Sequence, residues 1–378
     1  MTGMPLTAAN DIALVASRRR RMFLVKLTIV LILTPATFFV GSLFMTFSKL
    51  LFLLLVPVLT VGLISGRFGR ILMTDILLML YILWIAISIA LNNPSSFVTF
   101  VGSNAALFLG GYLVGRACIR SAEDFMEFSR FVCACTVLLL PFAVYEVFTH
   151  KKLLLALFDS IPGLGSHAIN YSGQRLGLYR AQVVFVHPIH WGLFASLGFG
   201  LVMTGLQSAY GLTTRTLWAG SIGIACFISV SSGPFLSLAG QLTLLMYWGL
   251  FRRFDHIWIK LMIGASLSYL VLEVLSSRPA YLAILERIAF SPETAYARQS
   301  LREYGLAQIG RTPIFGVGYN TWELPPWMSG STDNFWLLSA VVYGVPAFVF
   351  LLGMFLTSMI GAARRKFPED SLLSDQRR

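Results

Sequence analysis

The chain has 378 residues, of which 56% are hydrophobic and only 12% are charged, whereas soluble domains average about 25% charged residues. Its mean hydropathy of +0.74 means more apolar surface than one water-soluble core would bury, so a lipid bilayer must take part of that burial. The formal net charge of +12 would suit a nucleic-acid binder, but basic residues also gather on the cytoplasmic loops of membrane proteins. The location of the charge therefore decides between the two classes.

The apolar residues fall into runs of the length that crosses a bilayer as a helix, about 20 residues. Ten such runs are present, at 27–46, 49–66, 71–91, 98–118, 128–148, 182–204, 214–230, 234–251, 257–275 and 334–361. A transmembrane β-barrel is excluded because its strands alternate apolar and polar residues, and LLFLLLVPVLTVGLIS does not. We therefore expect an all-α polytopic membrane protein with about ten transmembrane helices.

Charge fixes the expected orientation, because basic residues favour the cytoplasmic side. With residues 1–26 as a cytoplasmic tail, 27–361 as the membrane domain and 362–378 as a second cytoplasmic tail, 19 of the 29 Lys and Arg residues face the cytoplasm. The first run has no obvious cleavage site after it and is expected to be an uncleaved signal anchor. The long outer loops are then 149–181 and 276–333, the latter preceding the last span.

The outer loops are where chemistry is expected. They hold nine of the ten remaining basic residues, against the usual bias. The cytoplasmic loops have neither a phosphate-binding P-loop nor a paired-aspartate motif for a nucleotide-sugar metal complex, so a nucleotide-dependent reaction is disfavoured. No metal, cofactor or nucleic-acid partner is predicted, and the cysteines are interpreted as buried small apolar residues.

The first outer loop and the following span read QRLGLYRAQVVFVHPIHWG (174–192). Arg180 supplies a permanent positive charge, and a guanidinium binds phosphate oxygens in a bidentate fork. His187 and His190 are spaced as neighbours on one helix face but have no third ligand for a metal. The alternative interpretation is that Arg180 and the histidines only anchor a helix at the membrane interface.

The second outer loop contains a predicted surface helix. Ser291, Pro292 and Glu293 are typical of a helix N-terminus and Gly310 of a C-terminal stop, which predicts a helix over 292–309. Arg298 and Arg302 are one turn apart on it and share a face, so they are candidates to bind a diphosphate. A solvated face or an anchor to headgroups remains the alternative.

The rest of the second loop, RTPIFGVGYNTW (311–322), is not a dinucleotide fingerprint, although its two glycines allow a tight turn. Trp322, Trp327 and Trp336 flank the return into the membrane, where they serve either as belt anchors or as a sugar-stacking surface. Asp333 and Asn334 precede the last span and are candidates for a general base or a helix cap.

Three acids lie in or at the ends of predicted spans, where a charged side chain is a functional candidate. Asp75 is near the cytoplasmic end and is expected to reach the headgroups. Glu146 and Glu273 are near the outer end and are expected to pair with the arginines there.

Taken in order, three stretches resemble the bacterial O-antigen ligase and Wzy-type polysaccharide polymerase superfamily. They are RLGLYRAQVVFVHPIHWG, SVSSGPFLSLAGQLTLL (229–245), and R-x-x-x-R with PIFGVGYNTW and DNFWLLSAVVYGVPAFVFLL (333–352). The resemblance implies a GT-C-like glycosyltransferase that uses undecaprenyl-diphosphate-linked glycans on the periplasmic face of the bacterial inner membrane, without metal or nucleotide. The chain departs from the pattern at Val183, where the family has Gly, at Ser232, where it has Arg, and at Asp333, where ligases have His.

The resemblance also implies roles for individual residues. Asp333 is the first candidate for the general base and His187 the second, while Arg180 stabilises the departing diphosphate. The glycan would contact Trp322, Trp327 and Asn334. The diphosphate would be bound by Arg180, Arg298, Arg302, Arg311 and Arg278.

Three functions remain open at this point. A polymerase of O-antigen or exopolysaccharide is favoured by Asp333 in place of the ligase His. A ligase would transfer the finished glycan to another acceptor. A transporter or flippase of lipid-linked sugars would need inverted repeats and broken helices, and neither is visible. A polymerase would work with membrane lipids, a chain-length regulator and a flippase as partners.

The predicted orientation is testable with topology reporters fused after Gly165 and after Ser329. Both fusions should report the periplasm, because both positions lie in predicted outer loops. A cytoplasmic signal from either fusion would refute the orientation.

Overall fold

The computed structural model describes residues 6–364 except 42, 172, 276–291 and 326–333, and it is mainly helical. A 3-10 turn, η1 (Pro94–Ser96), precedes α4, and a π-helical turn, η2 (Leu201–Gly205), follows α7. The helices in chain order are α1 (Leu6–Leu33), α2 (Phe47–Ile64), α3 (Met73–Asn92), α4 (Phe97–Cys118), α5 (Ala122–Thr149), α6 (Leu153–Asp159), α7 (Pro188–Gly200), α8 (Leu212–Phe227), α9 (Ser232–Phe251), α10 (Ile257–Leu275), α12 (Pro292–Arg311), α13 (Phe335–Tyr343) and α14 (Val345–Arg364).

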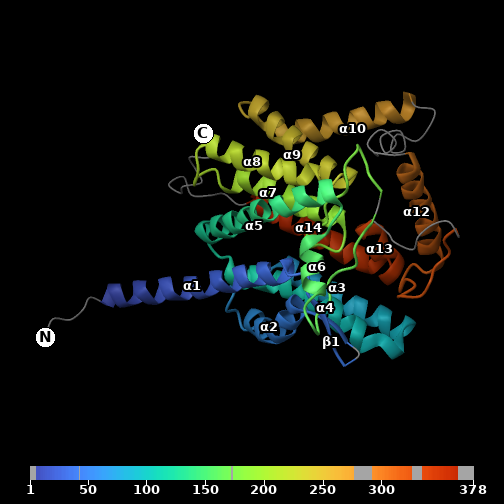
Figure 1. Ribbon diagram of the computed structural model, residues 1–378, viewed down its shortest axis with the longest axis horizontal. Coiled ribbons are helices and arrows are strands. Elements are labelled where there is room, and N and C mark those ends of the chain that lie inside the picture. The colour runs from blue at the N-terminus through green and yellow to red at the C-terminus, as the bar shows by residue number, and fades with distance from the viewer. Residues whose placement is uncertain (1–5, 42, 172, 276–291, 326–333, 365–378) are drawn as a thin grey trace.

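Most of the long helices run along one direction, the horizontal axis of Figure 1. The first half of α1 extends beyond the others at the left, and α12 lies across the helix ends at the right. Two apolar cores hold the helices together, one around Trp191 and Ile222 and the other around Tyr81 and Leu351. Helix α4 contributes to both cores and so joins the two halves of the bundle.

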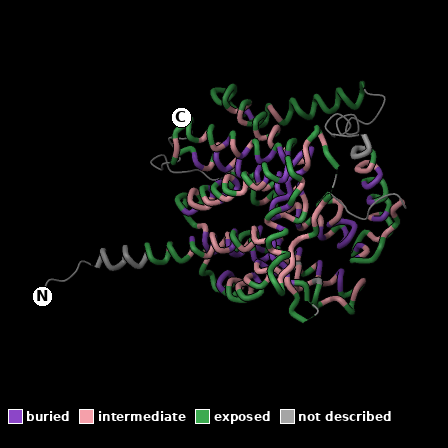
Figure 2. The backbone as a smooth tube through the Cα atoms, in the orientation of Figure 1, coloured by how far each residue is buried: buried purple, intermediate pink, exposed green. Residues whose placement is uncertain are grey.

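Within the described residues, seven helices are long and apolar enough to cross a bilayer: α2, α3, the η1–α4 segment, α5, α9, α10 and α14. Figure 2 shows that most of α10 is exposed, although Ile257 at its start is buried, and its exposed side chains include Met262, Leu267 and Val274. Such an apolar surface is unfavourable in contact with water but favourable in contact with the lipid hydrocarbon of a bilayer. The chain is thus a mainly helical, polytopic membrane protein.

Four of the ten predicted spans have a different structure from the one expected. The 182–204 segment becomes helical only at Pro188, because residues 181–187, of which 181–184 are buried, are held in an irregular conformation. The 214–230 segment forms α8, which has only 16 residues. The 334–361 segment is two helices separated at Gly344.

The expected first span, 27–46, is the fourth difference. Helix α1 begins far earlier, at Leu6, and ends at Leu33, before Pro35. The remainder forms an antiparallel hairpin of β1 (Thr37–Val40) and β2 (Leu43–Thr46). Its aromatic and β-branched residues favour strands, and Gly41 takes the positive φ (+61°) that a tight hairpin turn requires. The hairpin joins the first outer loop, because Thr37 and Gly165 exchange two backbone hydrogen bonds of 2.9 and 2.8 Å.

The GVG segment (316–318) explains the break between α13 and α14. The N–H groups of Val317 and Gly318 donate to the carbonyls of Val341 (3.0 Å) and Val342 (2.8 Å), so this irregular segment occupies the gap. Gly316 and Gly318 both have φ of +63°, and a Cβ on either would overlap the neighbouring chain. The tight turn expected from these glycines is therefore confirmed, and it anchors the end of the second loop.

The end of α3 secures the same segment from the other side. Ser88 donates to the carbonyl of Phe315 at 2.6 Å, and the Asn93 side chain accepts from the N–H of Tyr319 at 2.9 Å. Trp84 stacks on Phe315 with 5.5 Å between ring centroids. The second loop is thereby attached to the α3–α4 connection, which is also predicted to be on the outer side.

The opposite ends of α3 and α4 carry a different polar cluster. Asp75 is 2% exposed and pairs with Arg116 at 3.4 Å, while Tyr112 donates to the same carboxylate. Arg116 also donates to the carbonyls of Phe68 and Arg70, each at 2.7 Å. The expectation that Asp75 reaches the headgroups is wrong, because its charge is neutralised inside the protein.

The break at Gly344 gives a stability prediction. Gly344 has φ of +88°, and a Cβ there would overlap the carbonyl oxygen of Ile314. Gly344→Ala should therefore lower the free energy of unfolding by about 2–4 kcal/mol through strain and overpacking. The measurement is the thermal unfolding midpoint of the purified protein in detergent.

The matched control is Gly361→Ala, in the same helix α14, where an added Cβ meets nothing within 4 Å. It should leave the midpoint unchanged or raise it slightly, because Ala is favoured over Gly in a helix by about 1 kcal/mol. Equal midpoints for Gly344→Ala and Gly361→Ala would contradict the close approach.

Candidate functional site

Arg180 lies at the end of the first outer loop and is only 6% exposed. Its Nη2 donates to the Ser231 hydroxyl at 2.5 Å and its Nε to the Ser229 carbonyl at 3.5 Å. The next residue, Ala181, donates its N–H to the carbonyl of Ile228 at 3.2 Å. The loop is therefore bound to the turn between α8 and α9.

Arg298 approaches the same turn from the second outer loop. It lies half-buried on α12 and donates from Nη2 to the Ser232 hydroxyl at 3.4 Å. Because Ser231 and Ser232 are adjacent, Arg180 and Arg298 from two separate loops converge on one short segment. We refer to Arg180, Arg298, Ser231 and Ser232 as the arginine–serine cluster.

The start of α9 adds to the positive potential of the cluster. Ser231 is the N-cap residue of α9, but its hydroxyl makes no capping bond to the helix; it accepts from Arg180 instead. The first-turn N–H groups of a helix carry partial positive charge and attract anions. Two guanidiniums and a helix N-terminus therefore meet at one point, which is an arrangement suited to a multiply charged anion.

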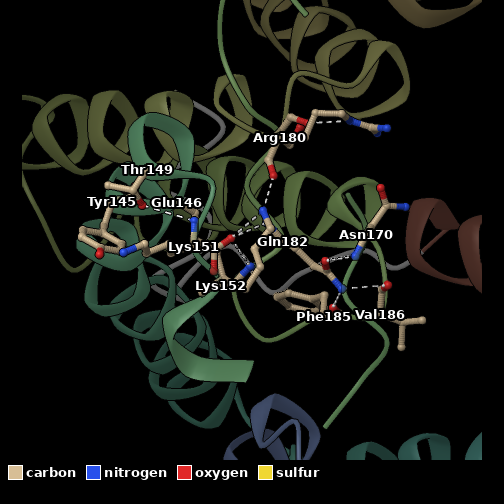
Figure 3. A network of polar contacts seen from close by, with 12 residues as sticks. Tyr145, Glu146, Thr149, Lys151, Lys152, Asn170, Arg180, Gln182, Phe185 and Val186 are labelled. Atoms are coloured by element: carbon tan, nitrogen blue, oxygen red, sulfur yellow. Dashed lines mark hydrogen bonds and ion pairs between the residues drawn. The ribbon is translucent and has the colours of Figure 1, made fainter. Parts of the chain in front are cut away.

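A buried ion pair supports the loop that carries Arg180, as Figure 3 shows. The Glu146 carboxylate, at the end of α5, is fully buried and accepts from Lys152 Nζ at 3.2 Å and from the N–H groups of Gln182 (2.8 Å) and Val183 (3.0 Å). Lys152 also donates to the Arg180 carbonyl at 2.6 Å. Glu146 pairs with this lysine and not with an arginine as expected, but it positions the backbone on which Arg180 lies.

Gln182 fixes the same loop on its other side. Its side-chain amide donates to the carbonyls of Ala168 (2.9 Å), Phe185 (2.8 Å) and Val186 (3.0 Å), and its oxygen accepts from the N–H of Asn170 at 2.9 Å. These bonds help to explain how 181–187 is held without helix or strand hydrogen bonds, because several of its backbone groups pair with the side chains of Gln182 and Glu146 instead.

Two strained residues flank the cluster. Val183 has φ of +58° and Val230 of +44°, and both are buried. A β-branched residue is disfavoured in this region by about 1–3 kcal/mol. Backbone strain of this kind persists where surrounding contacts enforce it, and strained residues are more frequent at functional sites. Here the enforcing contact for Val183 is the hydrogen bond to Glu146.

The other predicted site residues lie on α12, in the segment that follows it, at the start of α13, or outside the described residues. Arg302 is exposed on α12, Arg311 pairs with Glu323 at 2.5 Å on the surface, and Trp322 is half-buried. Asn334 caps α13 by accepting from the N–H of Leu337 at 3.1 Å. Arg278, Trp327 and Asp333 lie outside the described residues.

Helix α12 itself confirms the predicted surface helix. It begins at Pro292 as expected and ends at Arg311, so Gly310 does not stop it. Its buried residues include Leu301, and a Cβ on Gly305 would contact the Leu337 side chain of α13. Packing against α13 turns Arg298 toward the bundle while Arg302, one turn later, stays exposed.

Two histidines, His187 and His190, lie at the start of α7. His187 caps the helix, its Nδ1 accepting from the N–H of Ile189 at 3.2 Å, and its ring centroid is 6.2 Å from that of His190. Burial, and then the charge of His190, lowers the pKa of His167 in the preceding loop. Among the described residues, no group of three or more His, Cys, Asp or Glu side chains is arranged to hold a metal ion.

The sequence analysis missed the ion pair of Glu146 and Lys152. An acid near the outer end of a predicted span was recognised as unusual, but its lysine partner stood in the loop beyond the helix end. The available signal was the spacing of the two residues. Helix α5 ends at Thr149, its C-cap residue His150 takes the left-handed conformation, and this turns Lys152 back toward Glu146.

No family model, curated protein or solved structure matches the chain. The resemblance drawn from the motifs therefore stays a prediction.

The ion pair gives a second stability prediction. Lys152→Met would leave the Glu146 carboxylate buried without its cation, which costs about 3–5 kcal/mol. The unfolding midpoint in detergent should fall sharply, and the double variant Glu146→Gln/Lys152→Met should recover part of the loss.

Lys151→Met is the matched control, because Lys151 is adjacent but exposed. It should change the free energy of unfolding by no more than about 0.5 kcal/mol. If Lys152→Met and Lys151→Met had the same midpoint, the pair would not support the loop.

Proposed function

We propose that the protein is a membrane glycosyltransferase that polymerises undecaprenyl-diphosphate-linked oligosaccharide repeat units into O-antigen or exopolysaccharide. It would act on the periplasmic face of the bacterial inner membrane, with both chain ends in the cytoplasm. The observation that carries this proposal is the convergence of Arg180 and Arg298 on the adjacent Ser231 and Ser232.

The cluster suits a diphosphate for electrostatic reasons. Two like charges brought together in a partly buried place repel each other, so they are stabilised by an anion that lies between them. Guanidiniums bind phosphate oxygens through paired hydrogen bonds, and the hydroxyls of Ser231 and Ser232 can donate to further oxygens once the ligand is present. Burial of Arg180 strengthens each of these contacts.

Two departures from the family pattern are compatible with the proposal. Val183 replaces the family's Gly, yet it keeps the positive φ that favours Gly. Ser232 replaces an Arg, and Arg298 brings its guanidinium to that hydroxyl from α12. The backbone shape and the positive charge that the pattern calls for are thus both present here, by different means.

In the proposed reaction, a hydroxyl oxygen of the acceptor glycan attacks the anomeric carbon of the donor repeat unit. The new glycosidic bond forms as the bond to the diphosphate breaks, and the electron pair leaves with the diphosphate, whose charge the arginines stabilise. Asp333 takes the hydroxyl proton. His187 is the second candidate, but its Nδ1 is already engaged in capping α7. Attack from the opposite face inverts the anomeric centre.

The remaining residues have supporting roles in the proposal. Arg302 extends the positive face of α12 by one turn, and Trp322, Trp327 and Asn334 contact the glycan. Arg278 and Arg311 would engage the diphosphate from the second loop, Arg311 after release from Glu323. The reaction needs no metal or nucleotide, because the donor already holds the energy of the glycosidic bond.

The proposal predicts that Arg180→Ala and Arg298→Ala each abolish long glycan chains while single repeat units still form. The reason is that each variant removes charge stabilisation of the leaving group, which is worth about 10²–10³ in rate for one such contact. Lys at either position should restore little, because it lacks the bidentate fork. The measurement is glycan chain length in a deletion strain complemented with each variant.

Arg175→Ala is the matched control, since Arg175 lies in the same loop and its described hydrogen bonds are backbone bonds to Leu178. Membrane levels of all variants are compared by immunoblot. Normal chain length in both Arg180→Ala and Arg298→Ala would contradict the assignment of the arginines.

A further inference from the structure

A cavity of about 1030 Å³ with a mainly apolar lining lies at the end of the bundle opposite the arginine–serine cluster. Its walls come from the start of α3, the end of α4, the α4–α5 connection, η2 and the last turns of α14. Asp75 and Arg116 mark this end of α3 and α4, whereas the arginine–serine cluster lies beyond the far end of α5. We infer that the cavity binds the phosphate headgroup of an anionic phospholipid from the leaflet opposite the proposed reaction.

The positive charge of the cavity comes from Arg120. Arg116 also lines it, but its charge is matched by Asp75 at 3.4 Å. Arg120 is exposed, its Nε donates to the Ala117 carbonyl at 2.7 Å, and its guanidinium lies 5.4 Å from the Phe68 ring centroid. The ring and the carbonyl hold the guanidinium at the cavity wall.

Most of the acids near Arg120 are paired with a base, and Glu123 is exposed to solvent. Asp124 pairs with Arg18 at 2.9 Å and with Arg21 at 3.7 Å, and Asp75 pairs with Arg116. Arg18 also pairs with Glu127 at 3.4 Å, and Lys26 pairs with Glu127 at 2.6 Å. With Arg116 and Arg120 there are five basic side chains against four acids in this region, which leaves a net positive charge beside the cavity; the bases are Arg18, Arg21, Lys26, Arg116 and Arg120, and the acids are Asp75, Glu123, Asp124 and Glu127. Such basic pockets between membrane helices favour anionic headgroups.

The hydroxyl of Ser208 can complete the headgroup contact. Ser208 lines the cavity and donates to the sulfur of Met126 at 3.2 Å, a weak acceptor that a phosphate oxygen would replace. Ser121 also lines the cavity, but its hydroxyl caps α5 at the N–H of Asp124 and hydrogen-bonds the Glu123 carboxylate. The cavity therefore offers the Arg120 guanidinium and the Ser208 hydroxyl to an anion.

The rest of the lining favours a lipid over free phosphate. The same cavity is lined by four apolar residues, Leu72, Met73, Ile119 and Phe125. Ile119 directly precedes Arg120 in the sequence. An apolar wall beside a cationic group matches a molecule with a charged head and acyl chains. The cavity is also much larger than a phosphate ion needs.

The test compares lipids bound to the purified full-length protein by native mass spectrometry. The probes are dioleoylphosphatidylglycerol, which is anionic, dioleoylphosphatidylcholine, which is zwitterionic, and inorganic phosphate. The wild-type protein should retain phosphatidylglycerol in preference to phosphatidylcholine, and Arg120→Gln should weaken that binding roughly five-fold, the loss expected for one basic residue.

Arg253→Gln is the control, because Arg253 is exposed in the α9–α10 connection, on the same predicted side, and does not line the cavity. It should keep the preference of the wild type. Equal retention of both lipids, no effect of Arg120→Gln, or displacement of phosphatidylglycerol by millimolar phosphate would overturn the inference. Each readout is lipid binding, so the result is independent of glycan transfer.

Discussion

The buried carboxylate of Glu146 is the constraint on which the candidate site depends. A buried charge is tolerated only when it is paired and hydrogen-bonded, and Glu146 meets this need with Lys152 and with the N–H groups of Gln182 and Val183. Those contacts hold Val183 in a strained conformation and fix the backbone that carries Arg180. The arginine reaches Ser231 because an acid at the end of α5 sets the path of the loop.

A second set of contacts brings the other loop to the same place. The GVG segment fills the break between α13 and α14 and is secured by Ser88 and Asn93 at the end of α3. Helix α12 packs on α13 just before this anchor and directs Arg298 toward Ser232. The convergence of two arginines from distant segments is therefore a product of the fold, and the membrane helices serve as the rigid frame that positions them.

Much of this was predictable from local sequence, and the rest required tertiary contacts. Apolar runs predicted the membrane class, and the Ser-Pro-Glu start of α12 predicted that helix, because both signals act within a few residues. The hairpin at 37–46, the break at Gly344 and the late start of α7 were missed, since apolar composition alone does not distinguish a strand, a broken helix or a buried loop from a span. The lysine partner of Glu146 was missed because a turn at His150 brings it back to the acid.

The most direct test of the central claim uses the purified protein in lipid nanodiscs with an undecaprenyl-diphosphate-linked repeat unit, and separates the products by size. A polymerase whose arginines bind the leaving diphosphate should give a ladder, each step one repeat unit longer, with undecaprenyl diphosphate released at every step. Transfer of one glycan to a different acceptor, or an unchanged substrate, would contradict the account.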